Sequence, residues 1–359
     1  MHAMTVPASL RSLLDAVGPS GYEGGSAGVF AKLAGDFADP VNVDVTGSVH
    51  AHVAGTADAA PRIAIVGHID EIGVVVTHID DKGFLWFAGV GGWDPVILVG
   101  QRVALQTKNG VVRGVVGKKA IHLMEPDERT KAPKLTSLHI DIGAADGDEA
   151  KEHVRVGDVA VIDSDPVELL GERVASRAMD NRLGAYVALE AARRVAESGG
   201  AAGEVVAVGA AQEEITFAGA RTSAFALDPQ IAIVVDVTHA TDAPGVEERE
   251  LGSHHLGTGA VIQRGSTVHP VISELLVETA EAEGIKYTIE VSGRGTSTDA
   301  DAIHIARAGI ATGVVSIPLR YMHSPVEMVD LRDLEATVAL IAAFAKRVPA
   351  DLELRRLPS

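Results

Sequence analysis

Apolar residues recur about every 3.6 positions along several stretches of the chain, and shorter runs between them are almost entirely apolar. The first pattern places apolar side chains on one helix face and predicts helices over residues 6–17, 25–35, 181–197, 218–226, 268–283, 299–308 and 330–347. The second pattern predicts strands over residues 41–45, 49–53, 63–67, 204–211 and 231–237. The run Ile63–Gly67 is typical of a strand buried on both faces. The alternation of helices with buried strands predicts an α/β fold.

Residues 74–163 follow a different pattern. Short β-rich runs alternate there with Gly, Asp and Asn turns, and no long helical pattern occurs; the runs are Phe84–Phe87, Arg102–Gln106, Val111–Val116 and Asp158–Asp163. We therefore predict a small β domain inserted into the α/β domain. A chain of 359 residues, 47% of them hydrophobic, is long enough for two such domains.

The composition limits the chemistry and the partners. The chain has no cysteine, so any bound metal must be held by His, Asp and Glu, and a reducing compartment suits it. We find neither a secretory leader nor about 18 consecutive uncharged apolar residues, and so expect a soluble cytoplasmic protein. The net charge of -18 argues against nucleic acids and anionic membranes as partners.

Acidic residues and histidines follow several of the predicted strands. These segments are His68–Glu71, Arg177–Asn181, Ala211–Glu214, Asp236–His239 and Tyr321–Ser324. Open α/β sheets place their sites at the carboxyl ends of strands, and divalent ions such as zinc take imidazole and carboxylate ligands. A single histidine after a strand is more often a surface residue. The whole set favours a metal site in which two ions share a carboxylate.

Two of these segments suggest particular roles. Glu213 and Glu214 end an apolar strand, where two acids are costly to bury without a cation. One of them could bind metal while the other moves a proton, although an exposed acidic turn would also fit. Asp70 lies two residues after His68 and is the natural carboxylate to accept the second N–H of a metal-bound imidazole.

Taken together, the motifs resemble those of the M42 metallo-aminopeptidase family, which contains the tetrahedral and the glutamyl aminopeptidases. The matching motifs occur in the family's order; they are VGHIDEIG, SRAMDNRLGAY, AAQEEITFAGA, VVDVTHA and YMHSPVEMV. GGWDPVILVGQRV and the TSTDA segment ending at Ala300 are also similar to family segments. Several motifs in the correct order are far more specific than any one of them.

The resemblance implies a function: a dinuclear metal-dependent aminopeptidase that removes the N-terminal residue of short peptides. By this resemblance, His68 and Asp236 hold one ion, Glu214 and His323 hold the other, and Asp180 bridges them. The ions would be zinc or cobalt. A water shared by the ions would be the nucleophile, and Glu213 the general base and acid. Asp70 completes the set of expected catalytic residues.

The resemblance also implies an architecture. The fold would be zinc-peptidase-like, a mixed central sheet with helices on both faces, plus an inserted small β-barrel-like domain. Residues 1–72 and 165–359 would form the catalytic domain, and residues 73–164 would mediate oligomerisation, from dimers to dodecamers. A cis peptide bond is expected between Asp180 and Asn181.

Other readings remain open from the sequence. A metal-dependent deacylase or carboxypeptidase on a related fold is the main competitor, and a glycoside hydrolase or a non-enzymatic assembly protein are weaker ones. A serine hydrolase has one formal nucleophile elbow, Gly24–Gly28, which follows a helical segment where a strand is required. His122, His139, His254, His255 and His304 are left out as turn or surface histidines.

Overall fold

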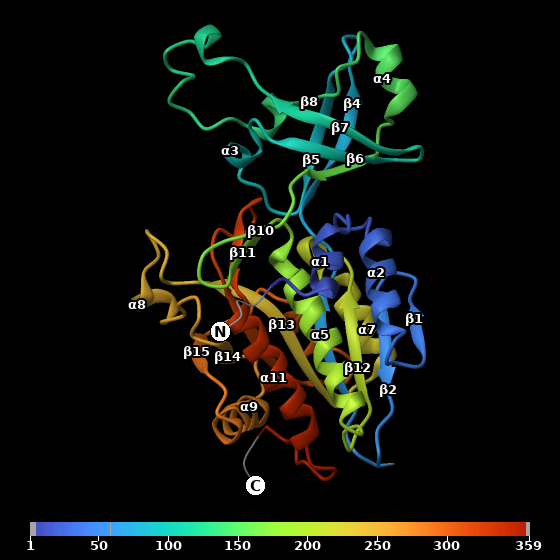
Figure 1. Ribbon diagram of the computed structural model, residues 1–359, viewed down its shortest axis with the longest axis vertical. Coiled ribbons are helices and arrows are strands. Elements are labelled where there is room, and N and C mark those ends of the chain that lie inside the picture. Colours follow the sequence, from blue (N-terminus) through green and yellow to red (C-terminus); the bar gives the residue numbers. More distant parts are fainter. Residues whose placement is uncertain (1–4, 58, 357–359) are drawn as a thin grey trace.

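The structure, a computed structural model, describes residues 5–57 and 59–356. It has two parts, an α/β body and a smaller β barrel above it (Figure 1). The chain enters the barrel after β3 and returns to the body after β9. The predicted fold class, a mixed sheet with helices on both faces plus an inserted barrel, is confirmed.

An eight-stranded mixed sheet forms the centre of the body, in the order β1-β2-β12-β3-β13-β16-β14-β15. Its strands are β1 (Val41–Val43), β2 (Val49–Val53), β3 (Ile63–His68), β12 (Val205–Ala210), β13 (Ile231–His239), β14 (Ala260–Gly265), β15 (Tyr287–Ser292) and β16 (Ala311–Leu319). The four central strands β12, β3, β13 and β16 are parallel, whereas β2 and β14 pair antiparallel to them. The carboxyl ends of these central strands therefore meet at one edge of the sheet.

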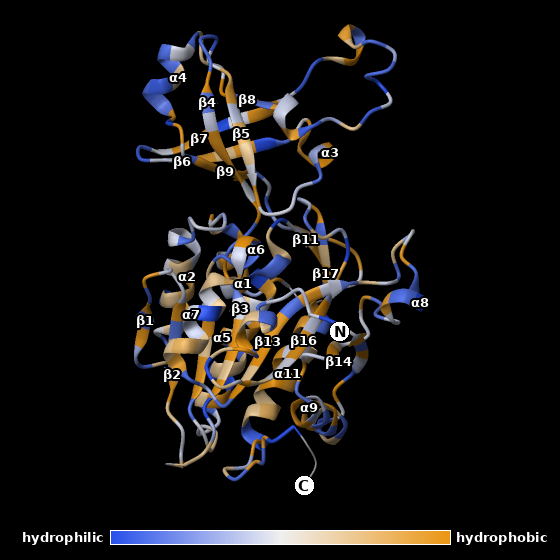
Figure 2. Ribbon diagram, turned by 180° about the vertical axis from the view of Figure 1, so that it is seen from behind, coloured by the Kyte–Doolittle hydropathy of each residue, from blue (hydrophilic) through white to orange (hydrophobic). Residues whose placement is uncertain are grey.

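Helices cover both faces of this sheet. One face packs against α1 (Ala8–Asp15), α2 (Gly24–Ala34), α5 (Met179–Glu197), α9 (Pro270–Glu283) and α11 (Leu331–Arg347). The other face packs against α7 (Ala218–Leu227) and α10 (Ala300–Ile303). Neighbouring residues of β13 alternate between the two cores, with Val235 in the first and Val234 in the second. This double burial explains the continuous apolar runs of the central strands (Figure 2).

The inserted part is a closed barrel with strands in the order β4-β5-β8-β7-β6-β9. The strands are β4 (Gly73–Ile79), β5 (Leu85–Val90), β6 (Arg102–Thr107), β7 (Gly110–Gly117), β8 (His139–Asp141) and β9 (Val159–Ile162). Its short helices are α3 (Pro95–Leu98), α4 (Gly147–His153), η1 (Ile121–Leu123) and η2 (Leu135–Ser137). The barrel has its own apolar core, separate from the two cores of the body.

The remaining elements flank the edge of the sheet that faces the barrel. A small sheet joins β10 (Val167–Glu168), β11 (Arg173–Ser176) and β17 (Glu327–Asp330), and the two short helices are α6 (Glu213–Thr216) and α8 (Glu248–Leu251).

None of the helices in the described residues has the length and apolarity that a membrane crossing requires.

The structure differs from the sequence prediction in the last third of the chain. The helix expected over 299–308 ends at Ile303, because the chain turns before Gly309, which has a φ of +102°. Strands β14, β15 and β16 were not predicted. β16 is buried along its whole length, so it lacks the polar-apolar alternation that marks a half-exposed strand.

Two glycines bring α5 close to the carboxyl end of β3. A Cβ atom on Gly67 would overlap the backbone of Gly184 and Ala185. A Cβ atom on Gly184 would likewise overlap the carbonyl oxygen of Val235 and the side chain of Asn181. Only hydrogen atoms fit between these backbones, so the N-terminal part of α5 lies directly against β3 and β13.

Replacing Gly67 with Ala should therefore push α5 away from β3. We expect a loss of about 1–3 kcal/mol in the free energy of unfolding, the usual cost of overpacking a core. Chemical denaturation measures it, with Gly28→Ala as the matched control, because Gly28 is exposed in α2 with nothing within 4 Å of its would-be Cβ. The control should be stabilised by about 0.5–1 kcal/mol, as for other helical glycines. Equal stability of the two variants would contradict the close approach.

Candidate metal centre

The acidic residues and histidines singled out from the sequence meet at the sheet edge that faces the barrel. His68 is the last residue of β3, and Asp236 lies near the end of β13. Asp180 lies at the start of α5, Glu213 and Glu214 open α6 just after β12, and His323 follows β16. Five separate segments thus each contribute to one site, as expected at the carboxyl ends of parallel strands.

The carboxylate of Asp180 lies between the two histidines. Its Oδ1 is 3.1 Å from His68 Nε2, and its Oδ2 is 3.3 Å from His323 Nε2. Two groups of potential metal ligands share this residue; they are His68, Asp180 and Asp236, and Asp180, Glu214 and His323. Within each group the ligand atoms lie within 4.8 Å of one another. One carboxylate could therefore reach two ions at once.

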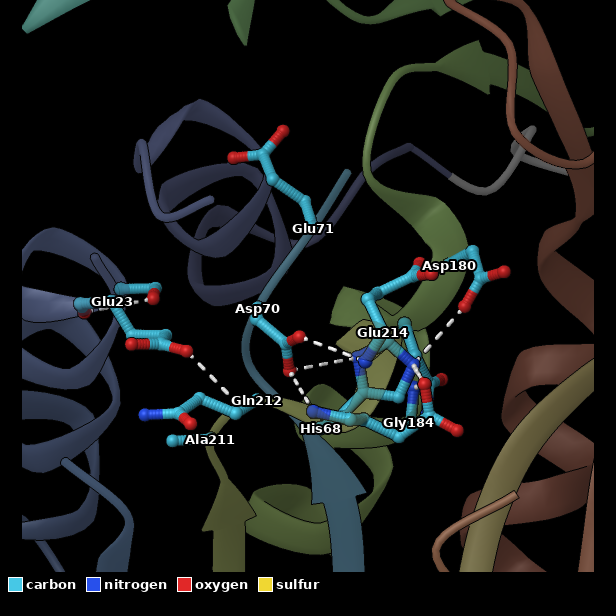
Figure 3. A network of polar contacts seen from close by, with 12 residues as sticks. Glu23, His68, Asp70, Glu71, Asp180, Gly184, Ala211, Gln212 and Glu214 are labelled. Carbon is cyan, nitrogen blue, oxygen red and sulfur yellow. Dashed lines mark hydrogen bonds and ion pairs between the residues drawn. The ribbon is translucent and has the colours of Figure 1, made fainter. Parts of the chain in front are cut away.

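Asp70 contacts both the His68 ring and the backbone at the start of α6 (Figure 3). Its Oδ1 is 3.3 Å from His68 Nδ1, on the side of the ring away from Asp180. Its two oxygens also accept the backbone N–H groups of Glu213 and Glu214, each at 3.1 Å. Burial alone would raise the pKa of Asp70, but the contacts with His68 and with the backbone N–H of Glu214 hold it below its ordinary value. Asp70 thus links the histidine to the acidic pair.

Burial and mutual repulsion disturb the other acids of the site. Burial, together with the charges of Asp236 and Asp299, raises the pKa of Glu213 to about 10. Burial also raises the pKa of Asp236 and brings that of Asp299 to about 7. By contrast, the hydrogen bond to Asp180 raises the pKa of His323 to about 11. Among the described residues of the site, the buried carboxylates outnumber the two histidines that could neutralise them.

Several buried polar atoms of the site have no hydrogen-bond partner among the described residues. They are Nδ1 of His68, Oε1 of Glu214 and both carboxylate oxygens of Asp299. The His68 nitrogen still has its longer contact with Asp70, and Glu214 Oε1 lies 3.4 Å from His323 Nε2. Buried acceptors without donors are costly, and a divalent cation beside Asp180 would satisfy the Glu214 oxygen. The residues present therefore fit a metal centre without any thiolate.

The structure adds a positioning residue that the sequence analysis did not single out. Glu327, at the start of β17, is 2% exposed. Its Oε2 accepts the backbone N–H of Asp180 at 3.1 Å, and its Oε1 accepts that of His323 at 2.7 Å. One side chain thus fixes two candidate ligands to each other. The signal in the sequence was an acid four residues after His323, in YMHSPVEMV.

Asn181 anchors the chain next to Asp180. The peptide bond between the two residues is cis, as the resemblance implied. The Asn181 side chain donates to the carbonyl oxygen of Val235 at 2.8 Å and accepts from the N–H of Gly184 at 2.8 Å. These bonds attach the start of α5 to β13, which carries Asp236.

Glu71, which follows Asp70, takes no part in the candidate metal site. Its side chain points away from His68 (Figure 3) and forms ion pairs with Arg177 and, at 3.2 Å, with Arg182. Arg182 is fully buried and also donates to the carbonyl oxygen of Leu13 at 2.9 Å. This network ties α1 to α5 and neutralises Glu71, so its role is structural.

Two histidines and the formal nucleophile elbow that the sequence analysis set aside lie outside the candidate metal site. His254 bonds Thr288 and the carbonyl oxygen of Leu251, at 2.7 Å and 3.0 Å. His139 packs against Phe84 and Trp86 in the barrel. Gly24–Gly28 is the first part of α2 and follows no strand, so no nucleophile elbow forms there.

Comparison with known proteins agrees with this geometry. Residues 47–340 match the model of a family described as M42 glutamyl aminopeptidase. The lysyl aminopeptidase of Pyrococcus furiosus is 34% identical over 347 residues, covering 95% of this chain and 97% of that protein. A TET aminopeptidase from a marine sediment archaeon of the Thaumarchaeota is 35% identical, with a TM-score of 0.89 and 95% of each chain covered. The Pyrococcus horikoshii TET1 peptidase, which can assemble into a tetrahedron or a large octahedral shell, is 31% identical, with a TM-score of 0.82 and 94% of this chain and 98% of that chain covered.

The fold and its relatives define this chain as an enzyme of the peptide hydrolase class. It belongs to the M42 family of metal-dependent aminopeptidases, the family that its sequence motifs resemble. The residues around Asp180 form two groups that could hold a metal ion.

Glu327 gives a test of how the site is held together. Glu327→Gln replaces one of the two acceptor oxygens by an NH₂ group. This donor would face a backbone N–H donor, so one of the two hydrogen bonds would be lost. We expect the affinity for zinc to fall about 10- to 100-fold, as for other residues that orient metal ligands. Competition with a chelator measures this affinity. Glu335→Gln, an exposed glutamate on α11 that pairs with Arg194, is the control, and equal affinities in the two variants would exclude the positioning role.

Proposed function

We propose that this chain is a dinuclear metal-dependent aminopeptidase that removes the N-terminal residue of short peptides. In this proposal, His68 and Asp236 hold one ion, Glu214 and His323 hold the other, and Asp180 bridges them. The ions are zinc or cobalt. The observation that carries the proposal is the position of Asp180, whose two carboxylate oxygens face two different histidines.

Two bound ions would supply Lewis acidity toward the peptide carbonyl and lower the pKa of the attacking water. The chain itself supplies the proton transfer. Glu213 belongs to neither ligand group, lies 3.7 Å from His68 Nε2 and lines the same pocket as the ligands. The charge of two bound cations would lower its raised pKa, and Glu213 would then be able to take a proton from the attacking water and give one to the departing amine. Asp70 positions both partners, because it contacts His68 and accepts the backbone N–H of Glu213.

The rival functions fit the site less well. A glycoside hydrolase needs two carboxyl groups facing each other across a sugar, whereas Glu213 and Glu214 adjoin in sequence and share the support of Asp70. A deacylase or carboxypeptidase could use the same metal centre, and the family membership favours action at the amino terminus. Hydrolysis of aminoacyl-p-nitroanilides, with and without added zinc or cobalt and after EDTA treatment, separates these alternatives.

We also propose that residues 73–164 make subunit contacts in a homo-oligomer, between a dimer and a dodecamer. Two large side chains on η1, Ile121 and Leu123, are 58% and 71% exposed. They lie on a segment that extends from the barrel away from the body (Figure 1). Apolar side chains in such a position suit burial against another subunit. The absence of cysteine fits the cytoplasm, where we place the enzyme.

Asp180 is the residue whose loss should affect both ions. Asp180→Ala should lower the content of both metals together, whereas His68→Ala and His323→Ala should each chiefly lower one, because only the bridging ligand belongs to both coordination shells. Metal analysis of the purified variants gives the number of ions per chain. Two ions retained in Asp180→Ala would rule out the bridging role.

Glu213→Gln should separate proton transfer from metal binding. It preserves shape and hydrogen bonding but removes the proton acceptor, so kcat should fall about 10²- to 10⁴-fold with metal content unchanged. Glu214→Gln is the matched comparison and should lose metal at one site, because an amide is a poorer ligand than a carboxylate. Kinetics and metal analysis of both variants decide the assignment. The reverse result would exchange the two roles, and full activity in both would refute the mechanism.

The oligomer can be tested by light scattering at micromolar concentration. We expect an assembly, and we expect the double variant Ile121→Asp/Leu123→Asp to have a smaller mass, because charges cannot be buried cheaply at a subunit contact. Val45→Asp, at a fully exposed valine of the α/β body, is the control and should keep the mass of the wild type. A monodisperse wild-type monomer would contradict the proposal.

A further inference from the structure

The pocket beside the metal site extends well beyond the candidate ligands. It has a volume of about 340 Å³, within the range of ligand-binding pockets. Past the ligands it is lined by Thr238, Thr296, Ser297, Thr298, Met322 and Glu290. Met322 and the threonine methyl groups offer apolar surface, whereas Glu290 on β15 places a carboxylate in this part of the pocket.

Glu290 has no basic partner among the described residues. Its Oε1 accepts a hydrogen bond from the Thr238 hydroxyl at 2.9 Å, and no Lys, Arg or His nitrogen of the described residues lies within the 4.0 Å of an ion pair. Two other partly buried acids of the body have such partners: Glu204 pairs with Arg62, and Asp242 with Arg320. The other ionisable residue on this side of the pocket, His239, is exposed. A half-buried carboxylate without a counter-charge favours a cationic ligand.

The position of Glu290 relative to the metal site suits a long side chain. Thr238 and Asp236 lie two residues apart on the same face of β13, which separates them by about 6.6 Å along the strand. Because the Thr238 hydroxyl donates to Glu290, this separation also sets the Glu290 carboxylate apart from the metal site. A substrate residue whose backbone lies at the metal site could therefore reach Glu290 with a four-carbon stem such as that of lysine.

We propose that this pocket receives the side chain of the N-terminal residue and that Glu290 selects a basic one, lysine or arginine. The inference rests on the aminopeptidase function proposed above. Thr238 positions the Glu290 carboxylate, the apolar wall contacts the methylene stem, and the carboxylate pairs with the cationic end. An acidic N-terminal residue would place two like charges together in a confined pocket, so glutamyl substrates should be poor ones.

The experiment compares substrates that differ only in the terminal charge. Lysyl-, arginyl-, norleucyl- and glutamyl-p-nitroanilides are assayed with the metal-loaded wild type, with Glu290→Gln and with Glu278→Gln. Glu278 is an exposed glutamate of α9 outside the pocket, so the control removes the same charge elsewhere. Norleucine matches the lysine stem without its ammonium group.

In Glu290→Gln we expect kcat/KM for the lysyl and arginyl substrates to fall about 10- to 100-fold, the value of one charge-assisted hydrogen bond. The norleucyl substrate should change less than about threefold, and Glu278→Gln should match the wild type throughout. Glu290→Lys should reverse the preference toward the glutamyl substrate. Calorimetric titration with free L-lysine and L-norleucine provides a readout that does not depend on turnover, and the preference for lysine should disappear in Glu290→Gln.

The possible failures are distinguishable. An equal loss on all substrates would overturn the inference, because Glu290 would then bind the α-amino group that every substrate carries. Unchanged ratios between the lysyl and norleucyl substrates would also overturn it, while leaving the aminopeptidase function intact. If the metal-loaded wild type cleaves none of the substrates, the proposed function itself fails, and the titrations still report whether the pocket prefers lysine.

Discussion

The arrangement of this protein depends on one electrostatic constraint, the crowding of buried carboxylates at the edge of the central sheet. Asp180, Glu213, Glu214 and Asp236 approach one another there, and among the described residues only His68 and His323 lie close enough to balance them. Such a group is unfavourable by itself, because burial and mutual repulsion both oppose ionisation. It becomes favourable when cations occupy it, which is why metal binding is the function that this geometry supports best.

The surrounding scaffold keeps these groups together. The absence of side chains at Gly67 and Gly184 lets α5 lie against β3 and brings Asp180 to His68. Glu327 then joins Asp180 to His323, and Asp70 joins His68 to the acidic pair on α6. The two glycines act through the packing of backbones, Glu327 acts through backbone amides, and Asp70 acts through backbone amides and the His68 ring. The precision of the site therefore comes from buried elements of the fold and not from exposed loops.

Catalysis and substrate choice are assigned to different parts of the same pocket. The candidate ligands come mainly from the central parallel strands and the segments that follow them, whereas Glu290 comes from the edge strand β15. The barrel lies on the same side of the body, so an assembly through its residues would also shape access to the pocket (Figure 1).

The sequence by itself determined the α/β class, the β-rich insert and the group of residues that meet at the site. It could do so because apolar periodicity reports burial locally, and because the carboxyl ends of parallel strands bring segments such as His68–Glu71 and Ala211–Glu214 together. Only the tertiary structure separated Glu71, neutralised by Arg177 and Arg182, from its neighbour Asp70, which faces His68. Only the tertiary structure revealed Glu327 and Glu290 as well, since their significance lies in what they contact and not in their local pattern. Partners more than 100 residues away, such as Asp180 for Glu327, leave no periodic trace in the sequence around either residue.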